Sequence, residues 1–482
     1  MSASRPERVH ARLRDQSRSG MIRPMGFAAL RQNLRRSHGF EPLELEGTLP
    51  EDLRGTLFRV GPGLYDRFGK SVAHPFEADG AMTAVRFGDQ PEGATRVIES
   101  AGYLEEQAAG RRLYGTGAGW LRNVIANFRQ QAKNTGNTSA WLHEGQLYAL
   151  MEGARPTRID RDSLAVLGED DFAGVLGSTF SAHPHRVAAL QTSFNFGVRY
   201  GREHMLDVYA IPDQGRVRKL TSVTMPWAAL VHDFIATEKH LLFTICPVEI
   251  VIWRALLGVS NFEKLLDWKP ERGAELIIVP IAAPEQVTRI AADPFWVWHF
   301  ANAFEQGDDL VVDLCHYVDF GTLKAIRTGK DADPTFKPSP PLYHRARIDR
   351  RSKRMTSEQR LDSPAEFPRV HPRVEGSEHS VAYLHSSIDE RDCIRALEVE
   401  SGRESHWLPD QPTALSEPIP VERADRPGDE RGVWLLTLGL DEARDRSFVA
   451  VLDGAQLERG PVAKLWFDQP IPLTFHGAFA PA

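Results

Sequence analysis

Short runs of apolar residues recur along the chain from about residue 47 to the C-terminus, and turn-forming residues separate them. Nine of these runs have the length and the Val, Ile, Leu, Phe and Tyr content that are typical of strands. Helical periodicity is scarce, and the gaps seldom hold the roughly 10–15 residues that each helix of a doubly wound α/β fold needs. The pattern predicts an all-β protein. The nine predicted strands are 55–60, 146–151, 206–211, 240–245, 275–281, 309–314, 380–386, 433–440 and 447–452.

Two segments, residues 25–36 and 248–265, instead repeat their apolar residues with a helical period. Each is predicted to be either a helix packed on the core or an apolar surface patch that enters a membrane interface. The residues concerned are Phe27, Leu30 and Leu34 beside Arg31, Arg35 and Arg36 in the first segment, and Trp253, Leu256, Leu257 and Phe262 in the second.

Many short strands over more than 400 residues, with no evident linker, suggest one large closed β architecture. A β-propeller closes by radial repetition of four-stranded blades. If seven blades share the chain, each receives roughly 60 residues. We therefore expect a single domain over residues 25–482, preceded by a disordered tail over 1–24. The charged, proline-rich stretches 322–376 and 401–432 are predicted to be surface loops.

Composition narrows the function classes. The chain has 482 residues, with 58 Lys and Arg against 65 Asp and Glu, so its net charge of −7 offers no basic field for nucleic acid. Three widely spaced cysteines form no zinc or disulfide pattern. No apolar run is long enough to span a membrane, and the N-terminus has no secretory signal. These features predict a cytoplasmic protein.

Common catalytic motifs are missing. The segment 63–71 resembles a phosphate-binding loop, but five residues separate its two glycines where four are required. Neither a G-x-S-x-G elbow nor an H-E-x-x-H helix occurs. Hydrolase, zinc-protease and nucleotide-binding functions are therefore disfavoured.

Histidines carry the clearest signal. Four of the 17 occur in apolar, aromatic surroundings beside predicted strands: His183, His232, His299 and His476. One such histidine is usually a hydrogen-bonded core residue. Four of them, spaced 49, 67 and 177 residues apart, can converge only where separate segments meet at one axis, as the inner strands of a propeller do.

Four neutral imidazoles suit a transition metal such as iron, zinc, copper or nickel. They would leave the full charge of a divalent ion, which carboxylates bonded to the remaining ring N–H groups would offset. Acids in apolar surroundings are the candidates, and three stand out: Glu152, Glu366 and Glu430.

Several ordered segments together resemble the carotenoid cleavage oxygenases, a family that includes apocarotenoid oxygenases, lignostilbene dioxygenases and the retinoid isomerohydrolase. The similarity runs from LEGTLPEDLRGTLFRVGPGL (45–64) through HPFEADGAM, NTSAW, LYALMEGARP, SAHPHR, HDFIAT, HFANAFE and EFPR to FHGAF, and it covers about 430 residues.

The resemblance implies a seven-bladed propeller with a helical or loop cap over the active-site face. It also implies Fe(II) held by His183, His232, His299 and His476, with His185 as the less favoured member of its His-Pro-His pair. Glu152 and Glu366 match second-layer acids, and either Asp429 or Glu430 matches the third, with Glu430 preferred. Thr138 matches a threonine beside the open iron position.

The implied reaction is cleavage of one conjugated C=C bond of a carotenoid or apocarotenoid by O₂ to give two carbonyl products. Stilbene or phenylpropanoid cleavage is the alternative, although Met151 replaces the lysine that binds the phenol in lignostilbene-cleaving relatives. A metal-free binding scaffold is a third possibility. An apolar polyene substrate implies a peripheral membrane association. The candidate tunnel residues are Met151, Phe234, Trp296, Trp298, Phe300 and Phe475.

Overall fold

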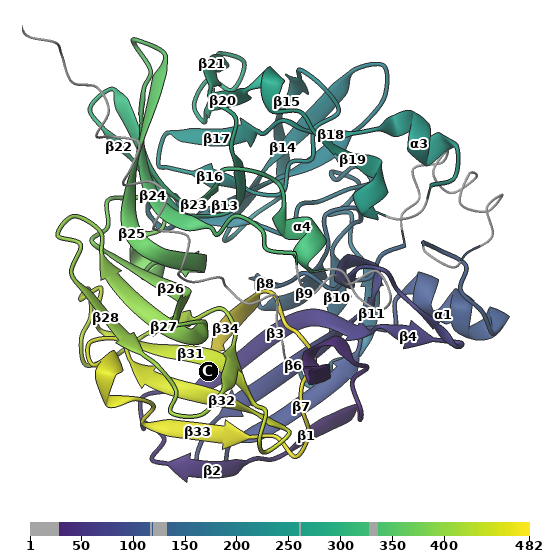
Figure 1. Cartoon of the computed structure of the whole chain (residues 1–482), viewed down its shortest axis with the longest axis vertical. Coiled ribbons are helices and arrows are strands. Elements are labelled where there is room, and N and C mark those ends of the chain that lie inside the picture. Colours follow the sequence, from purple (N-terminus) through teal and green to yellow (C-terminus); the bar gives the residue numbers. More distant parts are fainter. Residues whose placement is uncertain (1–27, 116–117, 119–132, 260–261, 327–335) are drawn as a thin grey trace, which may run out of the picture.

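Antiparallel strands form seven blades around a central axis in the computed structural model of the chain (Figure 1). The structure describes residues 28–115, 118, 133–259, 262–326 and 336–482. The predicted tail 1–24 and Phe27 lie outside these residues. The predicted seven-bladed propeller and all nine predicted strands are confirmed.

Each of the first four blades is one sheet, whose strands follow one another from the axis outward. The first is β34 (Gly477–Pro481), β3 (Gly55–Leu64), β6 (Asp79–Phe87), β7 (Glu92–Val97) and β1 (His38–Pro42). The second is β8 (Ser139–His143), β9 (Gln146–Leu150), β10 (Thr157–Ile159) and β11 (Val166–Glu169). The third is β12 (His185–Val187), β13 (Thr192–Arg199), β14 (His204–Pro212) and β15 (Arg218–Met225). The fourth is β16 (Phe234–Ala236), β17 (His240–Ile245), β20 (Ala274–Pro280) and β21 (Thr288–Ala292).

The fifth and sixth blades share the long strand β25 (Arg354–Arg369), which is the outer strand of one and the inner strand of the next. The fifth also contains β22 (Trp296–Gln306), β23 (Asp309–Tyr317) and β24 (Leu342–Asp349). The sixth continues with β26 (Val381–Ile388), β27 (Arg391–Glu398) and β28 (Glu404–Trp407). The seventh is β29 (Thr413–Leu415) with β30 (Ile419–Glu422), then β31 (Val433–Asp441), β32 (Arg446–Asp453), β33 (Ala463–Trp466) and β2 (Glu44–Gly47).

Strands from both ends of the chain close the ring. β34 pairs with β3 in the first blade, and β2 pairs with β33 in the seventh. Inner strands of neighbouring blades contact one another, including β34 with β8, β12 with β16 and β16 with β22. Apolar clusters fill the space between adjacent blades, so the strands in the middle of a blade are buried on both faces.

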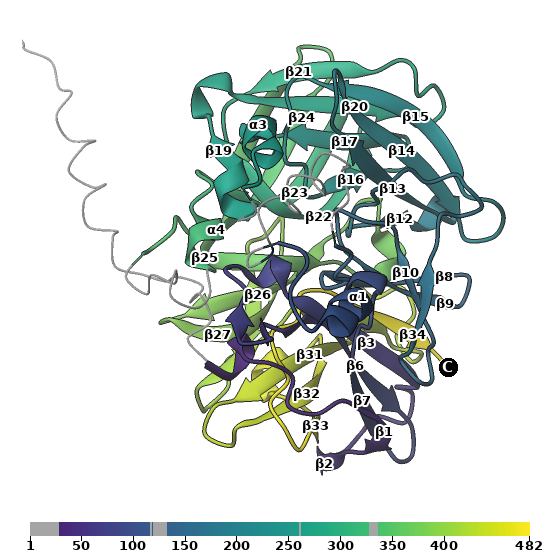
Figure 2. The same ribbon diagram turned by 90° about the vertical axis from the view of Figure 1, so that its right-hand side faces the viewer.

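Four long insertions emerge on one face of the propeller. Strand direction alternates within a blade, so the loops after the second and fourth strands emerge where the inner strands begin. The insertions contain β4 (Asp66–Arg67), β5 (Lys70–Ser71), α1 (Ala101–Ala109), β18 (Val248–Ile250), α3 (Ile252–Leu256), β19 (Leu266–Trp268) and α4 (Thr322–Ala325). Figure 2 looks onto the side that carries α1 and α3. The predicted cap is confirmed, built more from loops than from helices.

The remaining described helices are short 3₁₀ turns: η1 (Ala28–Arg31), η2 (Pro75–Glu77), η3 (Ala188–Leu190), η4 (Phe262–Leu265), η5 (Pro270–Arg272), η7 (Pro372–Val374) and η8 (Leu457–Arg459). No helix in the described ranges is long and apolar enough to cross a bilayer.

The predictions for three segments are confirmed only in part. The segment 25–36 contributes only η1 to the described chain, and Leu30 and Leu34 are buried in the core. In 248–265 the β-branched residues at the start form β18, and α3 ends before Gly258, which has a positive φ of 81°. The stretch 322–376 holds β24 and β25, and the charged side chains in the first part of β25 mark an exposed strand at the edge of a blade rather than a loop.

Candidate metal centre

The four predicted histidines meet on the propeller axis. His183 and His232 each lie two residues before an inner strand, β12 and β16, while His476 directly precedes β34 and His299 lies near the start of β22. Inner strands of all blades run in the same direction, so their first residues gather at one end of the axis. The four histidines, which are far apart in the sequence, are therefore close together in the structure.

Ring-to-ring distances show how tight this cluster is. The ring centroid of His183 lies 4.4 Å from that of His232, 4.7 Å from His476 and 5.3 Å from His299. The centroids of His299 and His476 are 4.8 Å apart. One ring nitrogen each from His183, His232 and His299 falls within a common span of 4.8 Å, close enough to bind one ion.

The nitrogens themselves fit a metal. Nε2 of His183 and Nε2 of His299 are buried without a hydrogen-bond partner, an arrangement that is costly unless something binds there. Burial and the neighbouring histidines hold the pKa of His183 well below its usual value, and burial lowers the pKa of His476 to about 4. Both rings are therefore neutral near pH 7 and offer lone pairs, as metal ligands must.

Carboxylates hold the second nitrogens of two of these rings. His232 Nδ1 lies 2.7 Å from Glu152 Oε1, and His299 Nδ1 lies 2.5 Å from Glu366 Oε2. The hydroxyl of Tyr317, which the sequence did not single out, donates to Glu366 Oε1 at 2.6 Å. Burial alone would raise the pKa of Glu366, but His299 and these donors outweigh it, so the pKa is lowered and the group stays a carboxylate.

The third acid is Glu417, and the prediction of Glu430 or Asp429 was wrong. His476 Nδ1 donates to Glu417 Oε1 at 2.9 Å. Glu430 instead accepts hydrogen bonds from the backbone amides of Ser380 and Val381 at the start of β26, between 2.9 and 3.0 Å. Asp429 is exposed and bonds the amide of Arg431.

Glu417 also forms ion pairs with two arginines. Arg369 Nε donates to Oε1 at 2.8 Å, and Arg59 Nη1 lies 3.3 Å from Oε2. Burial alone would raise the pKa of Glu417, but Arg369, His476 and Arg59 outweigh it and hold the pKa well below the usual range. Sequence reasoning missed this acid because it placed 401–432 in a surface loop. Its apolar setting between Leu415 and Ile419 was the available signal.

An apolar cavity of about 170 Å³ opens beside the cluster. His232, His299 and His476 form part of its wall, together with Trp298, Phe475, Phe76 and Phe367. Phe367 adopts a positive φ of 51° and stacks on His299 with a centroid separation of 5.0 Å. A strained backbone at this position holds an aromatic ring against the predicted metal site.

Two of the six tunnel candidates, Trp298 and Phe475, line this cavity. Three do not. Phe234 packs against Phe243 in the core, Trp296 packs against Phe320, and Phe300 faces a polar chamber on the other side of the cluster. Met151 is half-buried, its sulfur accepts from the amide of Gly153, and it is not among the residues that line the cavity. An apolar sequence context therefore does not distinguish a residue of the core from a residue of the cavity wall.

The polar chamber explains the second histidine of the His-Pro-His pair. His185 Nε2 lies 2.8 Å from Asp233 Oδ1, and both residues line this chamber of about 300 Å³. Alternation along an extended segment would let His183 and His185 share a face, but His185 is held by its own carboxylate. His183 alone joins the four-ring cluster.

Thr138 lines the apolar cavity at the end of a firmly held segment. Its hydroxyl donates to Asn137 Oδ1 at 3.2 Å, and Asn137 Nδ2 donates to the carbonyls of Phe76 and Ala78 at 3.1 and 2.8 Å. A Cβ at Gly80 would meet the carbonyl oxygen of Thr135 at 2.6 Å, so glycine permits this close approach. These contacts fix both Thr138 and Phe76 in the cavity wall.

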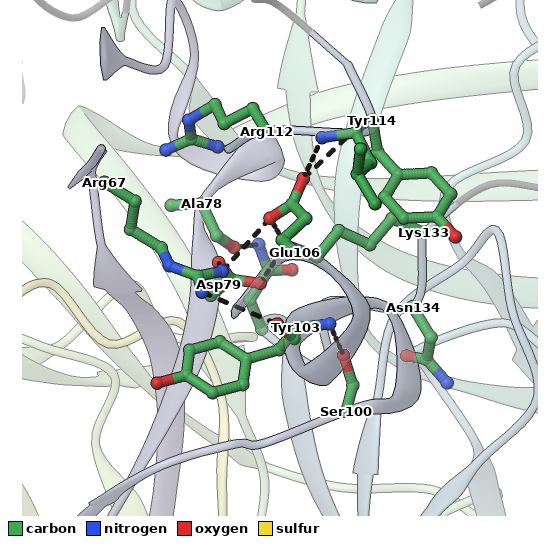
Figure 3. Close-up of polar contacts among 12 residues, drawn as sticks. Arg67, Ala78, Asp79, Ser100, Tyr103, Glu106, Arg112, Tyr114, Lys133 and Asn134 are labelled. Carbon is green, nitrogen blue, oxygen red and sulfur yellow. Dashed lines mark hydrogen bonds and ion pairs between the residues drawn. The ribbon is translucent and has the colours of Figure 1, made fainter. Parts of the chain in front are cut away.

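A buried ion cluster anchors the start of the same segment (Figure 3). Arg67 Nη1 contacts Asp79 Oδ2 at 2.8 Å and Glu106 Oε2 at 3.0 Å, and Lys133 Nζ contacts Glu106 at 2.8 Å and also Asp79. Two cations thus balance two carboxylates without access to solvent. The cluster joins β4, β6 and α1 to the segment that leads to Thr138.

Comparisons with known proteins agree with this geometry. The family model described as retinal pigment epithelial membrane protein (RPE65) matches residues 32–481. The apocarotenoid-15,15'-oxygenase of Synechocystis is 30% identical over 461 residues, covering 91% of this chain and 92% of that protein. The isoeugenol monooxygenase of Pseudomonas putida is 26% identical, covering 91% and 94%.

A solved structure gives the same result. The cobalt-substituted Synechocystis apocarotenoid oxygenase superposes with a TM-score of 0.86 at 28% identity, covering 95% of this chain and 99% of that one. The family match spans nearly all of the described residues, and the fold agrees along its length. The chain is therefore an oxygenase and belongs to the RPE65 and carotenoid oxygenase family.

Proposed function

We propose that the protein is a non-haem Fe(II)-dependent dioxygenase that cleaves one conjugated C=C bond of a carotenoid or apocarotenoid with O₂ to give two carbonyl products. The observation that carries this proposal is the cluster of four buried histidine rings at the wall of an apolar cavity.

Iron would be held by His183, His232, His299 and His476. Neutral imidazoles suit Fe(II), and two of these rings have a buried nitrogen that no protein atom satisfies. When bound, iron supplies the redox chemistry by which O₂ reacts with an alkene. The donor set of this chain therefore fits the cofactor.

The protein's own residues hold and shape the site. Glu152, Glu366 and Glu417 fix the tautomers of three rings and offset the charge of a divalent ion. The fourth ring, that of His183, stays neutral because it is buried beside the other three. Trp298 and Phe475 supply flat apolar walls that align a planar polyene and exclude water.

Cleavage of a stilbene or phenylpropanoid is the second candidate, favoured by the similarity to isoeugenol monooxygenases and to a resveratrol cleavage oxygenase of Aspergillus fumigatus. The Synechocystis apocarotenoid oxygenase is more similar in sequence than either. A polyene is therefore the preferred substrate.

Metal binding tests the assignment. Single His→Ala variants at the four positions are purified and loaded anaerobically with Fe(II), and bound iron is measured by mass spectrometry. Each variant should lose iron and alkene cleavage together. His185→Ala is the matched control, because that ring is held by Asp233 in the other chamber. Near-stoichiometric iron in all four variants would overturn the proposal.

We further propose that the α3 segment rests on a membrane surface from which a poorly soluble polyene enters. Trp253 and Leu257 are each 60% exposed and Leu256 is 43% exposed. Three neighbouring apolar side chains on a short helix and at its C-cap suit the boundary between headgroups and acyl chains. Leu30 and Leu34 of the N-terminal segment are buried, so these two side chains do not serve this role.

Two arginines of the N-terminal segment form ion pairs within the protein. Arg35 pairs with Asp445, and Arg36 pairs with Glu41 and Asp468, so both already have acidic partners in the protein. Membrane attraction through these arginines is therefore not part of the proposal.

Liposome co-sedimentation tests the membrane proposal. A Trp253→Ser/Leu256→Ser/Leu257→Ser variant should no longer sediment with lipid vesicles while its thermal melting and iron content stay unchanged. Leu167→Ser/Leu190→Ser is the matched control, since these leucines are exposed on other blades. Undiminished sedimentation of the α3 variant would contradict the proposal.

A further inference from the structure

His385 is a buried polar side chain in the wall of the apolar cavity, and its role is not explained by the metal centre. It lies on β26 and is 4% exposed. Neither of its ring nitrogens has a hydrogen-bond partner. A buried polar atom without a partner is destabilising, so an unsatisfied imidazole in a ligand cavity points to a ligand that satisfies it.

Other polar side chains in this wall already have partners. Thr138 donates to Asn137, Ser339 donates to Asp319 at 2.6 Å, and Thr474 accepts from Arg59 at 3.1 Å. Ser416 accepts from the amide of Leu438 at 3.1 Å. Among the fully buried polar side-chain atoms of the described wall residues outside the four-ring cluster, those without a hydrogen-bond partner are the ring nitrogens of His385 and the hydroxyl of Thr322.

A carboxylate beside His385 sets what the ring can bind. Asp392 Oδ2 lies 3.4 Å from Nε2 of His385, and it also accepts from the amide of Leu415 at 3.1 Å, which fixes its position on β27. A carboxylate only accepts hydrogen bonds, so it favours the tautomer that carries the proton on Nε2. Nδ1 is then an acceptor, which suits a hydroxyl donor better than a carbonyl oxygen.

His385 is linked to the four-histidine cluster through its neighbours Glu366 and Phe367. It pairs in register with Glu366, the acid that holds His299. The ring of Phe367 lies between His385 and the cluster, with centroids 6.2 Å from His385 and 5.4 Å from His476. A substrate bound at His385 through one end would therefore extend along Phe367 toward the four histidines.

We propose that His385, oriented by Asp392, binds the hydroxyl group at one end of the substrate and thereby selects a hydroxylated substrate and sets which double bond lies at the metal centre. This inference rests on the proposed oxygenase function and specifies its substrate class. Two sources share the chemistry: the ring hydroxyl of an apocarotenoid and the phenol of a stilbene or phenylpropanoid.

Binding to the metal-free protein tests the proposal without any turnover. Trp298 lines the cavity, so quenching of tryptophan fluorescence reports occupancy. One arm uses two apocarotenals that differ only by one ring hydroxyl. The other uses two propenylbenzenes with and without a para-hydroxyl. In at least one arm the wild type should bind the hydroxylated probe about 10-fold more tightly than its partner, and the arm that shows this identifies the source.

The variants make the assignment specific. His385→Phe should remove that preference by weakening the hydroxylated probe about 10-fold, while the other probe binds within about twofold of wild type. Asp392→Asn should reduce the preference and leave the apolar probe unaffected. Equal binding of both probes in both arms, no binding of any probe, or a parallel loss for both probes in His385→Phe would overturn the proposal. Loss of the preference in Thr322→Val with no effect in His385→Phe would overturn it as well.

The same proteins separate this inference from the proposed function. If the hydroxyl preference depends on His385 but iron-loaded wild type cleaves neither probe, the binding proposal stands and the oxygenase reaction fails. If iron-loaded wild type cleaves both members of a pair equally and His385→Phe changes nothing, the reaction stands and the role of His385 is refuted.

Discussion

Replacing Glu417 with Gln removes one negative charge from the centre of the site and leaves the shape of the side chain unchanged. Glu417 is 2% exposed and holds His476, Arg369 and Arg59. An amide keeps one acceptor oxygen but presents an NH₂ group to the donors on its other side. Arg59, 1% exposed, is then left as a buried cation without its partner charge.

The expected effects are large. Removing one partner of a buried ion pair costs about 3–5 kcal/mol, because the remaining charge stays in a poorly solvated environment. That loss is a substantial part of a typical unfolding free energy of about 5–15 kcal/mol. Loss of the carboxylate behind a metal-binding imidazole should also lower metal affinity by about 10–100-fold. Glu417→Gln should therefore weaken both folding and metal binding.

Glu430→Gln is the matched control, because Glu430 was the acid expected from sequence. Its carboxylate bonds backbone amides at the start of β26 and no histidine of the cluster. We expect it to cost about 1 kcal/mol in stability and nothing in metal affinity. Glu417→Asp keeps the charge and provides a folded comparison if Glu417→Gln is too unstable to purify.

Urea unfolding of the metal-free proteins measures the stability difference, and anaerobic titration with Co²⁺ or Fe²⁺ measures metal affinity. Wild-type stability and affinity in Glu417→Gln would refute the assignment of Glu417. A loss of metal affinity in Glu430→Gln but not in Glu417→Gln would restore the assignment made from sequence.

Three further predictions concern other residues of the site and of the propeller. His183→Ala should abolish metal binding, whereas His185→Ala should leave the metal content unchanged; equal metal content in the two purified variants would contradict this. Trp298→Leu should change the substrate preference with little loss of stability, whereas Phe234→Leu should lower the unfolding free energy by about 1–2 kcal/mol and leave the preference unchanged, as paired activity and urea assays would show. Burial lowers the pKa of His316 to about 4, so the unfolded chain binds a proton between about pH 6.5 and 4 that the folded chain excludes, and stability falls as the pH drops through this window. His316→Gln should reduce the loss of unfolding free energy between pH 7 and pH 5 by at most about 2 kcal/mol, and an unchanged pH dependence in urea titrations would refute the cause.

The nine strands that could be predicted lie mostly in the middle of the blades. β17, β20 and β31 are buried on both faces against neighbouring blades, so they appear in the sequence as continuous apolar runs. The inner strands β12 and β16 are only three residues long and follow functional histidines. Local composition carries little signal for such short strands, and the sequence alone did not locate them.

An exposed edge strand was predicted to be a loop, because its sequence is rich in charged residues. The first part of β25 lies at the outside of a blade, and on its neighbour β24 the exposed Arg347 pairs with Asp309. Charged side chains are suited to that exposed position, although in sequence they are typical of a loop. Strand pairing across the blade, not local composition, determines the structure there.

The residues of the candidate site also divide into those that the sequence predicts and those that it does not. The four histidines and two of their acids could be found because each lies in apolar surroundings and matches a family motif. Glu417 could not be found by that match, because its role depends on the break between β29 and β30 that brings it to His476. His385 carried no motif, and only the cavity and the missing hydrogen-bond partners single it out.

The most direct test of the proposed reaction is the mass of the products formed from a polyene by the iron-loaded protein in the presence of O₂. We predict two carbonyl fragments that together contain the substrate carbon skeleton, formed only when iron is bound and lost after chelation. The quadruple variant with His183, His232, His299 and His476 replaced by Ala should form neither fragment. Cleavage that survives chelation, or an iron-loaded wild type that cleaves no polyene, stilbene or propenylbenzene, would contradict the proposed reaction.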